Sequence, residues 1–348
     1  MTVTTPQPFS YQGLFAANAP VTTRGGNPRA KYDFAVAYPD PDSLPLDGLL
    51  ESLKVALDRE GRDLAYYPVP AGLPKLREYV VEKLAKDRNI QTVPEDVALT
   101  AGSGEAIAML IQALTDPGDV LLTEEYVYLG TLRQMRRFGA DVRSVRCDSD
   151  GIIPEELEAT LKGLADEGKK VKFLYTIPTF QNPLGWTMTL ERRRKVLEVT
   201  RQFGVPVLED DCYVDLRFEG EDVTSFHSLD DTGQVLYVGS FSKIIAPGMR
   251  MGYLVAPPGS LPTGHELQGR GRGEPVRRPS HRGVSKKSRW RAYRRSEPGP
   301  PGEARRHAVR LGREFRRCRQ VEQAGGRTIR LAGATRGHRL GGDSRPGA

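Results

Sequence analysis

One lysine of this chain stands among residues that suit the formation of a Schiff base. Lys243 follows an apolar run that predicts a strand, and a proline-glycine turn and Arg250 come after it. A lysine must lose its proton before it attacks a carbonyl, and burial beside a second cation lowers its pKa. Arg250 can supply that charge and can also bind a phosphate. Ser240 and Ser242 add hydroxyl donors, although a surface lysine beside a turn is the plainer alternative.

Two connections between a predicted strand and a predicted helix could bind other parts of a flat, phosphate-bearing ligand. Residues 100–105 are rich in small side chains and open a helix, so their amides and the helix dipole could hold a phosphate. Tyr128 follows the apolar run 120–122 and could stack its ring on a heterocycle. Taken alone, residues 100–105 are equally a tight turn, and Tyr128 is equally a packing residue.

Polar residues also follow two further apolar runs. Asn182 lies in a loop made rigid by prolines and a glycine, where it could simply cap a turn. Asp210, Asp211 and then Tyr213 follow the run 205–209. A desolvated carboxylate at this point could keep a ring nitrogen protonated. Paired aspartates could instead bind a metal or cap the following turn.

These residues require a scaffold in which strands and helices alternate. The alternation predicts an α/β fold with a mostly parallel sheet between helices. Ligands of such sheets bind at the carboxyl ends of strands, where the residues above are expected. The predicted strands are 97–100, 120–122, 142–145, 171–175, 205–209, 235–238 and 251–255, and the predicted helices are 49–60, 74–87, 104–114, 127–138, 154–165 and 190–203.

In this order the segments resemble those of class I/II aminotransferases of fold type I, in particular the aminoadipate-aminotransferase and MocR-like branch. The resemblance covers residues 28–258 and rests on the Lys243 segment, on the Gln-Asn-Pro loop around Asn182 and on Asp-Asp-Cys-Tyr at 210–213. It implies the fold-type I large domain, a mostly parallel mixed sheet between helices, with pyridoxal 5′-phosphate (PLP) held on Lys243.

The resemblance also assigns roles to single residues, and it implies no metal. The implied catalytic residues are Lys243, Asp210 and Tyr213. The implied cofactor contacts are Ser103, Gly104 and Glu105 in the phosphate loop, Tyr128 stacking on the ring, Asn182 and Tyr213 at the phenolic oxygen, Asp210 at the pyridine nitrogen, and Ser240, Ser242 and Arg250 beside Lys243.

A reaction and an assembly follow from the same resemblance. The implied reaction moves an amino group from an amino acid to a 2-oxo acid, with the Lys243 amine carrying the alpha proton as general base and acid. In this family a tyrosine in a segment like 64–77 reaches the phosphate of the neighbouring subunit. Tyr67 fits that spacing better than Tyr66, which implies a homodimer, and a packing tyrosine is an equal alternative.

Charge divides the chain into an acidic body and a basic tail. The formal net charge is +7, but from Leu261 onward 21 Arg and 2 Lys face 6 Glu and 1 Asp, so the tail carries +16 and the body −9. Three cysteines predict neither a disulfide framework nor a zinc site. No apolar run approaches the roughly 20 residues of a membrane span, so no membrane partner is expected, and the cytoplasm is the expected location.

Three parts are expected: an N-terminal arm and substrate-side segment (1–45), a PLP-binding large domain (46–258) and an Arg/Gly/Pro-rich tail (259–348). Residues 34–41 lack a glycine that the family usually carries before Pro-Asp-Pro, which predicts altered substrate recognition. In the family, a small domain bearing the arginine for the substrate's alpha-carboxylate occupies the place of the tail. A basic, disordered nucleic-acid-binding tail is one interpretation.

The genetic code favours another interpretation of the tail. Codons for residues 302–312 permit a frame one nucleotide downstream that reads Glu-Lys-Arg-Asp-Ala-Met. Those for residues 321–339 permit Pro-Glu-Gly-Gly-Leu-Phe-Val-Trp. Both resemble segments of the family's small domain. We therefore interpret the tail as a frameshifted translation, from a lesion or a sequencing error. The small domain is then missing or scrambled, the tail is disordered, and nucleic acid is not an expected partner.

Three functions remain open at this point. A PLP-dependent aminotransferase is favoured. A PLP-binding module like the MocR regulators is the second, and the lack of a helix-turn-helix pattern before residue 46 speaks against it. The third is an inactive product of a frameshifted aminotransferase gene, which would keep the cofactor residues and lack turnover.

Overall fold

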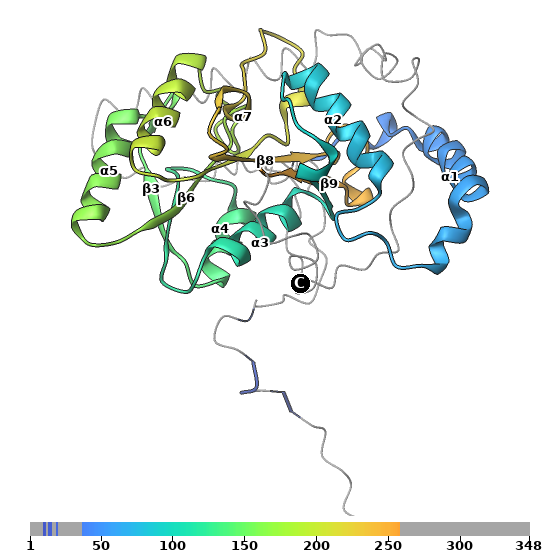
Figure 1. The fold of residues 1–348 in the computed structure, drawn as a ribbon, viewed down its shortest axis with the longest axis horizontal. Helices are drawn as coiled ribbons and strands as arrows, with labels where there is room; N and C mark the ends of the chain where they lie inside the picture. The colour runs from blue at the N-terminus through green and yellow to red at the C-terminus, as the bar shows by residue number, and fades with distance from the viewer. Residues whose placement is uncertain (1–9, 12, 16–18, 20–36, 258–348) are drawn as a thin grey trace, which may run out of the picture. The chain divides into compact units, whose positions relative to one another are not determined.

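The computed structural model describes residues 10–11, 13–15, 19 and 37–257. The predicted tail (259–348) and most of the N-terminal arm lie outside the described residues. The body is a central sheet with helices on both faces (Figure 1). This is the α/β architecture that the alternating pattern predicts.

The central sheet is mixed and mostly parallel. Its order is β1-β9-β8-β7-β6-β2-β3. Strands β3, β2, β6, β7 and β8 pair in parallel, whereas β9 runs antiparallel to both β8 and β1. The bounds are β1 Val97–Thr100, β2 Val120–Glu124, β3 Asp141–Val145, β6 Val171–Thr176, β7 Val207–Asp210, β8 Val235–Ser240 and β9 Gly252–Val255.

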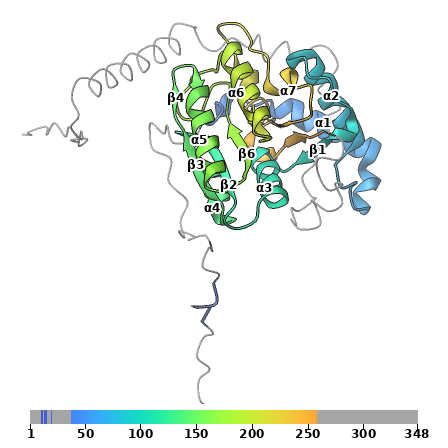
Figure 2. The same ribbon diagram turned by 60° about the vertical axis from the view of Figure 1, so that its left-hand side comes forward.

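Helices cover both faces of this sheet (Figure 2). One face packs against α3 (Ser103–Leu114) and α4 (Leu129–Arg137). The other packs against α5 (Pro154–Asp166), α6 (Leu190–Gln202) and the short α7 (Phe226–Leu229), and α2 (Pro74–Arg88) lies on the same side. Helix α1 (Leu46–Glu60) precedes them. Short 3-10 helices lie at Pro41–Ser43, Gly61–Ala65, Pro94–Asp96, Val214–Leu216 and Pro247–Met249.

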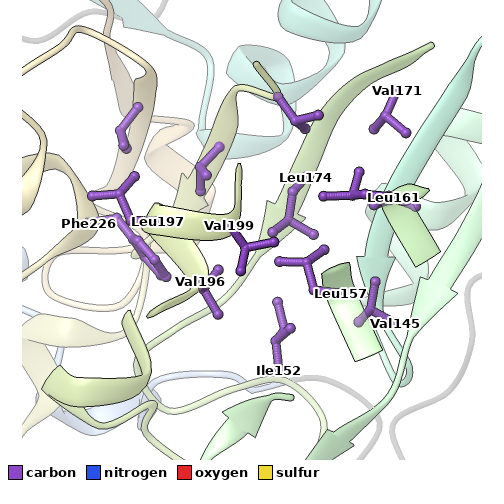
Figure 3. Close-up of a cluster of buried hydrophobic side chains, with 14 of the residues drawn as sticks. Val145, Ile152, Leu157, Leu161, Val171, Leu174, Val196, Leu197, Val199 and Phe226 are labelled. Atoms are coloured by element: carbon purple, nitrogen blue, oxygen red, sulfur yellow. The ribbon is translucent and has the colours of Figure 1, made fainter. Parts of the chain in front are cut away.

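Two apolar clusters fill the spaces between sheet and helices. Because successive strand residues point to opposite faces, Val120 and Leu122 of β2 join one cluster and Leu121 joins the other. Figure 3 shows the first cluster, in which Leu157 of α5 and Val196 of α6 lie over the sheet. Burial of such side chains stabilises the fold by roughly 1.5–3 kcal/mol each, and it fixes the strands whose ends carry the polar residues.

The direction of β9 brings its first residue to the same edge as the last residues of the other strands. Gly252 pairs with Ser240 at the end of β8 and with Thr100 at the end of β1. The segments that follow β1, β2, β6, β7 and β8, and the segment that precedes β9, therefore share one edge of the sheet. We call this the carboxyl edge.

The expected elements form, with shifted ends. The helix expected at 127–138 begins at Leu129, because Tyr128 at the N-cap position has non-helical dihedral angles (φ −55°, ψ 120°). The strand expected at 205–209 is Val207–Asp210, and the proline at 206, which lacks an N–H, precedes it. The sequence pattern predicts neither α7 nor the hairpin of β4 (Cys147–Asp148) and β5 (Gly151–Ile152). Among the described residues, no helix combines the length and apolarity that a membrane span requires.

Candidate active site

Lys243 lies at the carboxyl edge, in the turn that follows β8. Its Nζ donates a hydrogen bond to the Ala37 carbonyl oxygen (2.5 Å) and lies 5.9 Å from the centre of the Tyr213 ring. Burial lowers the pKa of Lys243, and the nearby Arg250 lowers it further, against an opposing effect of Cys212. These are the two causes expected from the sequence, and burial is the larger. The arrangement favours a neutral, nucleophilic amine.

Arg250 lies against the start of α3. It adopts a left-handed conformation (φ 49°) two residues before β9 begins, and its Nη2 donates to the Ala101 carbonyl oxygen (2.8 Å). Glycines make this approach possible. A Cβ added to Gly102 would lie 2.5 Å from Nη2, and one added to Gly252 would lie 2.6 Å from the Ser103 nitrogen. A guanidinium beside a helix N-terminus is an arrangement that suits an anion.

The start of α3 is held by its own side chains. Glu105 accepts a hydrogen bond from the Ala101 amide, and the Glu105 amide donates to the Gly102 carbonyl oxygen (3.1 Å). Ser103 and Gly104 are the first two residues of the helix. The three residues assigned to a phosphate loop therefore follow directly after Ala101 and Gly102, which Arg250 approaches.

Asp210 ends β7 on the face of the sheet that packs against α3 and α4. Its Oδ2 accepts a hydrogen bond from the Tyr175 hydroxyl (2.7 Å). Its Oδ1 is buried and has no hydrogen-bond partner among the described residues, although the thiol and amide of Cys212 lie close enough to lower the pKa. Burial outweighs these contacts and raises the pKa of Asp210 to about 6. Oδ2 is thus fixed by a hydrogen bond, whereas Oδ1 is open, in the sense that it has no hydrogen-bond partner among the described residues.

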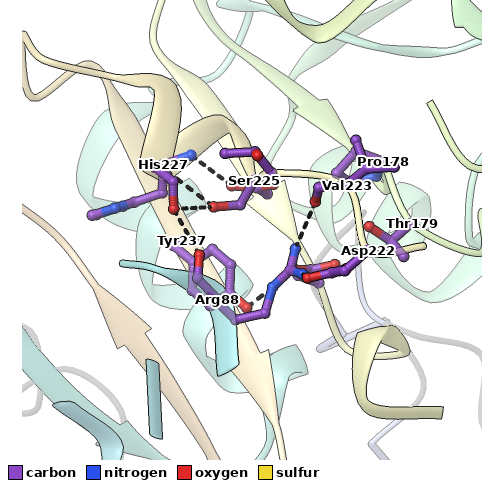
Figure 4. A network of polar contacts seen from close by, with 12 residues as sticks. Arg88, Pro178, Thr179, Asp222, Val223, Ser225, His227 and Tyr237 are labelled. Atoms are coloured by element: carbon purple, nitrogen blue, oxygen red, sulfur yellow. Dashed lines mark hydrogen bonds and ion pairs between the residues drawn. The ribbon is translucent and has the colours of Figure 1, made fainter. Parts of the chain in front are cut away.

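By the alternation of β7, Glu209 and Asp211 lie on the opposite face, where they pair with the buried Arg193 and Arg88. Figure 4 shows Arg88, Asp222 and Tyr237 of this network. Arg88 contacts Asp211 (2.9 Å) and Asp222, and the Tyr237 hydroxyl donates to Asp211 (3.2 Å). Glu209 accepts from two backbone amides at the start of α7 (both 2.9 Å). Asp211 is therefore committed to structure. Among the described residues, no group of three or more His, Cys, Asp or Glu side chains lies close enough to hold a metal ion.

Asn182 and Tyr213 form a pair at the same edge. The Asn182 Nδ2 donates to the Tyr213 hydroxyl oxygen (2.9 Å). Burial raises the pKa of Tyr213 above its ordinary value, so its hydroxyl stays protonated near neutral pH. Both groups can donate to an oxygen between or beside them.

The loop of Asn182 is anchored by Gln181. The Gln181 Nε2 donates to Glu124 Oε2 (2.7 Å) and to the Tyr126 carbonyl oxygen (2.6 Å). Glu124 also accepts from the Ile177 amide (2.9 Å), and burial raises its pKa to about 8. Glu124 thus connects the segment that leads to Tyr128 with the loop of Asn182.

The remaining expected residues differ in their placement. The half-exposed ring of Tyr128 lies against Gly130 and close enough to Tyr213 to affect the pKa of that phenol. Ser240 Oγ accepts from the Ser242 amide (3.1 Å). Tyr67 is 96% exposed and therefore makes no site with these residues within one chain.

The family follows from a comparison with known proteins. The family model for aminotransferase class I and II matches residues 37–269, which is more than half of the chain. The chain belongs to this family. In these aminotransferases the fold is of type I, and the described sheet with its flanking helices is that of the large domain.

Individual aminotransferases resemble this chain over part of their length. The aromatic-amino-acid aminotransferase 1 of Thermococcus litoralis is 35% identical over 64% of this chain and 54% of its own. The structure of an archaeal alanine:glyoxylate aminotransferase superposes with a TM-score of 0.62 (36% identity, 66% of this chain, 56% of that one). The structure of the α-aminoadipate aminotransferase LysN of Thermus thermophilus, complexed with N-(5′-phosphopyridoxyl)-L-leucine, superposes with a TM-score of 0.62. It is 32% identical, and the match covers 68% of this chain and 59% of that one. This chain spans about half the length of these relatives.

Three residues that contact the site were not predicted from the sequence. Tyr175 lies within an apolar run that predicts a core strand, and Glu124 and Gln181 lie in segments that predict loops. A signal for Tyr175 was available, because a tyrosine at a strand's carboxyl end must place its hydroxyl near a polar partner when it is buried.

Proposed function

We propose that this chain carries the PLP-binding domain of an aminotransferase that moves an amino group between an amino acid and a 2-oxo acid. One observation carries the proposal. The Lys243 amine, the open oxygen of Asp210, the Asn182–Tyr213 pair and Arg250 all lie at one edge of one sheet. The family match and the relative complexed with a phosphopyridoxyl compound support it.

The residues present fit PLP at each polar position. Arg250 and the start of α3 suit the phosphate, where Ser103, Gly104 and Glu105 lie. The donors of Asn182 and Tyr213 suit the phenolic oxygen. Asp210 Oδ1, buried and without a partner among the described residues, suits a protonated ring nitrogen. The exposed side of the Tyr128 ring can stack on the heterocycle, and Ser240 and Ser242 lie beside Lys243.

When bound, PLP supplies an aldehyde that captures amines and a ring that withdraws electrons from the substrate's alpha carbon. Lys243 would hold the aldehyde carbon covalently. The Lys243 Nζ would take the alpha proton as general base and give it back as general acid, because its lowered pKa favours the neutral amine that can accept a proton. Asp210 would hold the proton on the ring nitrogen, and Tyr213 would hold the phenolic oxygen by a hydrogen bond.

We also propose that the protein works as a homodimer. Apolar side chains on α1 and the segment after it are exposed, namely Leu46, Leu50, Leu53, Leu57, Leu64 and Tyr66, with Tyr67 beside them. A second copy could cover this surface and receive Tyr67 at its phosphate site. Sedimentation of the full chain tests this, and a monomer at all concentrations would contradict it.

The proposed activity is tested by turnover. The full chain, loaded with PLP, is offered a panel of amino acids with a 2-oxo acid acceptor, and Lys243→Ala is the control. We expect a new amino acid and a new 2-oxo acid in equal amounts from the wild type and none from Lys243→Ala. PLP binding without turnover on any donor would overturn the aminotransferase proposal for this chain and leave a PLP-binding module or an inactive product of the gene.

A further inference from the structure

We propose that Tyr175, supported by Thr131, is a positioning residue that sets the orientation of the Asp210 carboxylate toward the cofactor ring. The inference rests on the proposed function, because it concerns the group that would meet the ring nitrogen. It assigns a role to two residues whose positions in the sequence read only as an apolar strand and a helix.

Three hydroxyl and carboxyl groups form a chain behind Asp210. The Thr131 hydroxyl of α4 donates to the Tyr175 hydroxyl oxygen (3.2 Å), and the Tyr175 hydroxyl donates to Asp210 Oδ2 (2.7 Å). Tyr175 is fully buried in β6, the strand next to β7, and Thr131 is 2% exposed. Both hydroxyls are thus withdrawn from the protein surface, and each donates to the next group of the chain.

The order of donors fixes which way each proton points. The pKa of Tyr175 is raised well above its ordinary value, first by burial and then by the charge of Asp210. Tyr175 therefore stays protonated and donates to the carboxylate. With Oδ2 held in this way, Oδ1 is the oxygen left to face a ligand, and it has no partner among the described residues. If the Asp210 carboxylate could rotate freely, either of its oxygens could face the ligand, and its orientation toward the ring would not be fixed.

The fold contains a matched comparison. Tyr237 is 1% exposed in β8, the strand on the other side of β7, and its hydroxyl donates to Asp211 (3.2 Å). The two tyrosines thus have equal burial and each contacts one aspartate of the same pair, on opposite faces of the sheet. Only Tyr175 acts on the carboxylate that faces the site. Tyr175→Phe and Tyr237→Phe each remove one hydroxyl and keep the ring that packs in the core.

The first measurement needs no cofactor. The free energy of unfolding of the full chain, freed of PLP, is measured in urea from about pH 4 to about pH 8 for the wild type, Tyr175→Phe, Asp210→Asn and the double variant. The ionised Asp210 should become more costly to bury without the hydroxyl, so Tyr175→Phe should lose additional stability as the pH rises. This additional loss should vanish in the Asp210→Asn background. If Tyr175→Phe still loses additional stability with rising pH in the Asp210→Asn background, the inference is overturned.

The second measurement is the affinity for PLP, followed by absorbance at neutral pH. We expect Tyr175→Phe to bind PLP about ten-fold more weakly, the usual effect of losing a hydrogen bond to a charged group, and Tyr237→Phe to stay within about two-fold of the wild type. Equal affinities of the two variants overturn the positioning role. If the wild type itself binds no PLP, the proposed function fails, and the unfolding cycle alone decides whether Tyr175 acts on Asp210.

Discussion

Replacing Asp210 by asparagine should stabilise the cofactor-free protein while weakening its hold on PLP. Burial raises the pKa of Asp210 from 3.8 to about 6 in the folded protein. The folded state therefore holds this proton more tightly than the unfolded chain does. Stability that Asp210 gives below about pH 4 is lost as the pH rises through about 6, because the buried carboxylate then ionises.

The size of this effect follows from the difference in pKa. A change of about two pH units corresponds to about 3 kcal/mol. In Asp210→Asn that pH-dependent loss is absent, but an amide N–H₂ faces the site without a partner, at a cost of about 1–2 kcal/mol. Above about pH 6 the variant should be more stable than the wild type by about 1–2 kcal/mol. Below about pH 4 only the cost of the amide remains, so the variant should be less stable than the wild type by about 1–2 kcal/mol.

Urea unfolding followed by circular dichroism across this pH range measures the difference. Asp58→Asn, an exposed residue of α1, controls for the loss of a surface carboxylate. PLP affinity should move in the opposite direction, falling by about ten-fold or more, because the charged partner of the ring nitrogen is lost. An Asp210→Asn variant with the same stability difference from the wild type at both ends of the pH range would refute the reasoning.

Two further substitutions test the anion site and the loop anchor. Gly252→Ala would place a Cβ 2.6 Å from the backbone of Gly102 and Ser103, so it should displace the start of α3 and weaken PLP binding by about ten-fold or more. A Cβ added at Gly248 meets no atom within 4 Å, so Gly248→Ala should bind PLP normally in the same titration. Glu124→Ala removes the buried carboxylate that accepts from the Ile177 amide and the Gln181 side chain, so it should lower the free energy of unfolding by about 3 kcal/mol. Glu125→Ala, which changes the exposed neighbouring residue, should lower it by less than about 0.5 kcal/mol. Normal PLP binding by Gly252→Ala, or equal unfolding energies for the two glutamate variants, would contradict these assignments.

The sequence predicted the long elements of the fold because their apolar residues repeat regularly. The runs at 97–100 and 171–175 lie within one residue of β1 and β6, since strands buried on both faces are nearly continuous apolar segments. The hairpin of β4 and β5 and the four-residue α7 are too short to carry a period, so no pattern predicted them. The family match confirms the fold type that the resemblance implied.

The candidate site was predictable where it follows strand ends. Asp210 and Asp211 cannot be told apart by type, but the two-residue alternation of β7 with Leu208 in the core beside α3 places Asp210 on the site face. What local sequence could not give is pairing between distant segments. The contact of Tyr175 with Asp210 and that of Gln181 with Glu124 depend on which strands are neighbours in the sheet. The roles of the site residues stay predictions.

The central claim, that Lys243 is the residue that takes PLP, is tested most directly by chemical trapping. The full chain is incubated with PLP, reduced with borohydride and digested with a protease, and the masses of its peptides are measured by mass spectrometry. We predict the mass of a reduced phosphopyridoxyl group on the peptide that contains Lys243, and no such label in Lys243→Ala. A label on another lysine, or equal labelling of the variant, would contradict the assignment.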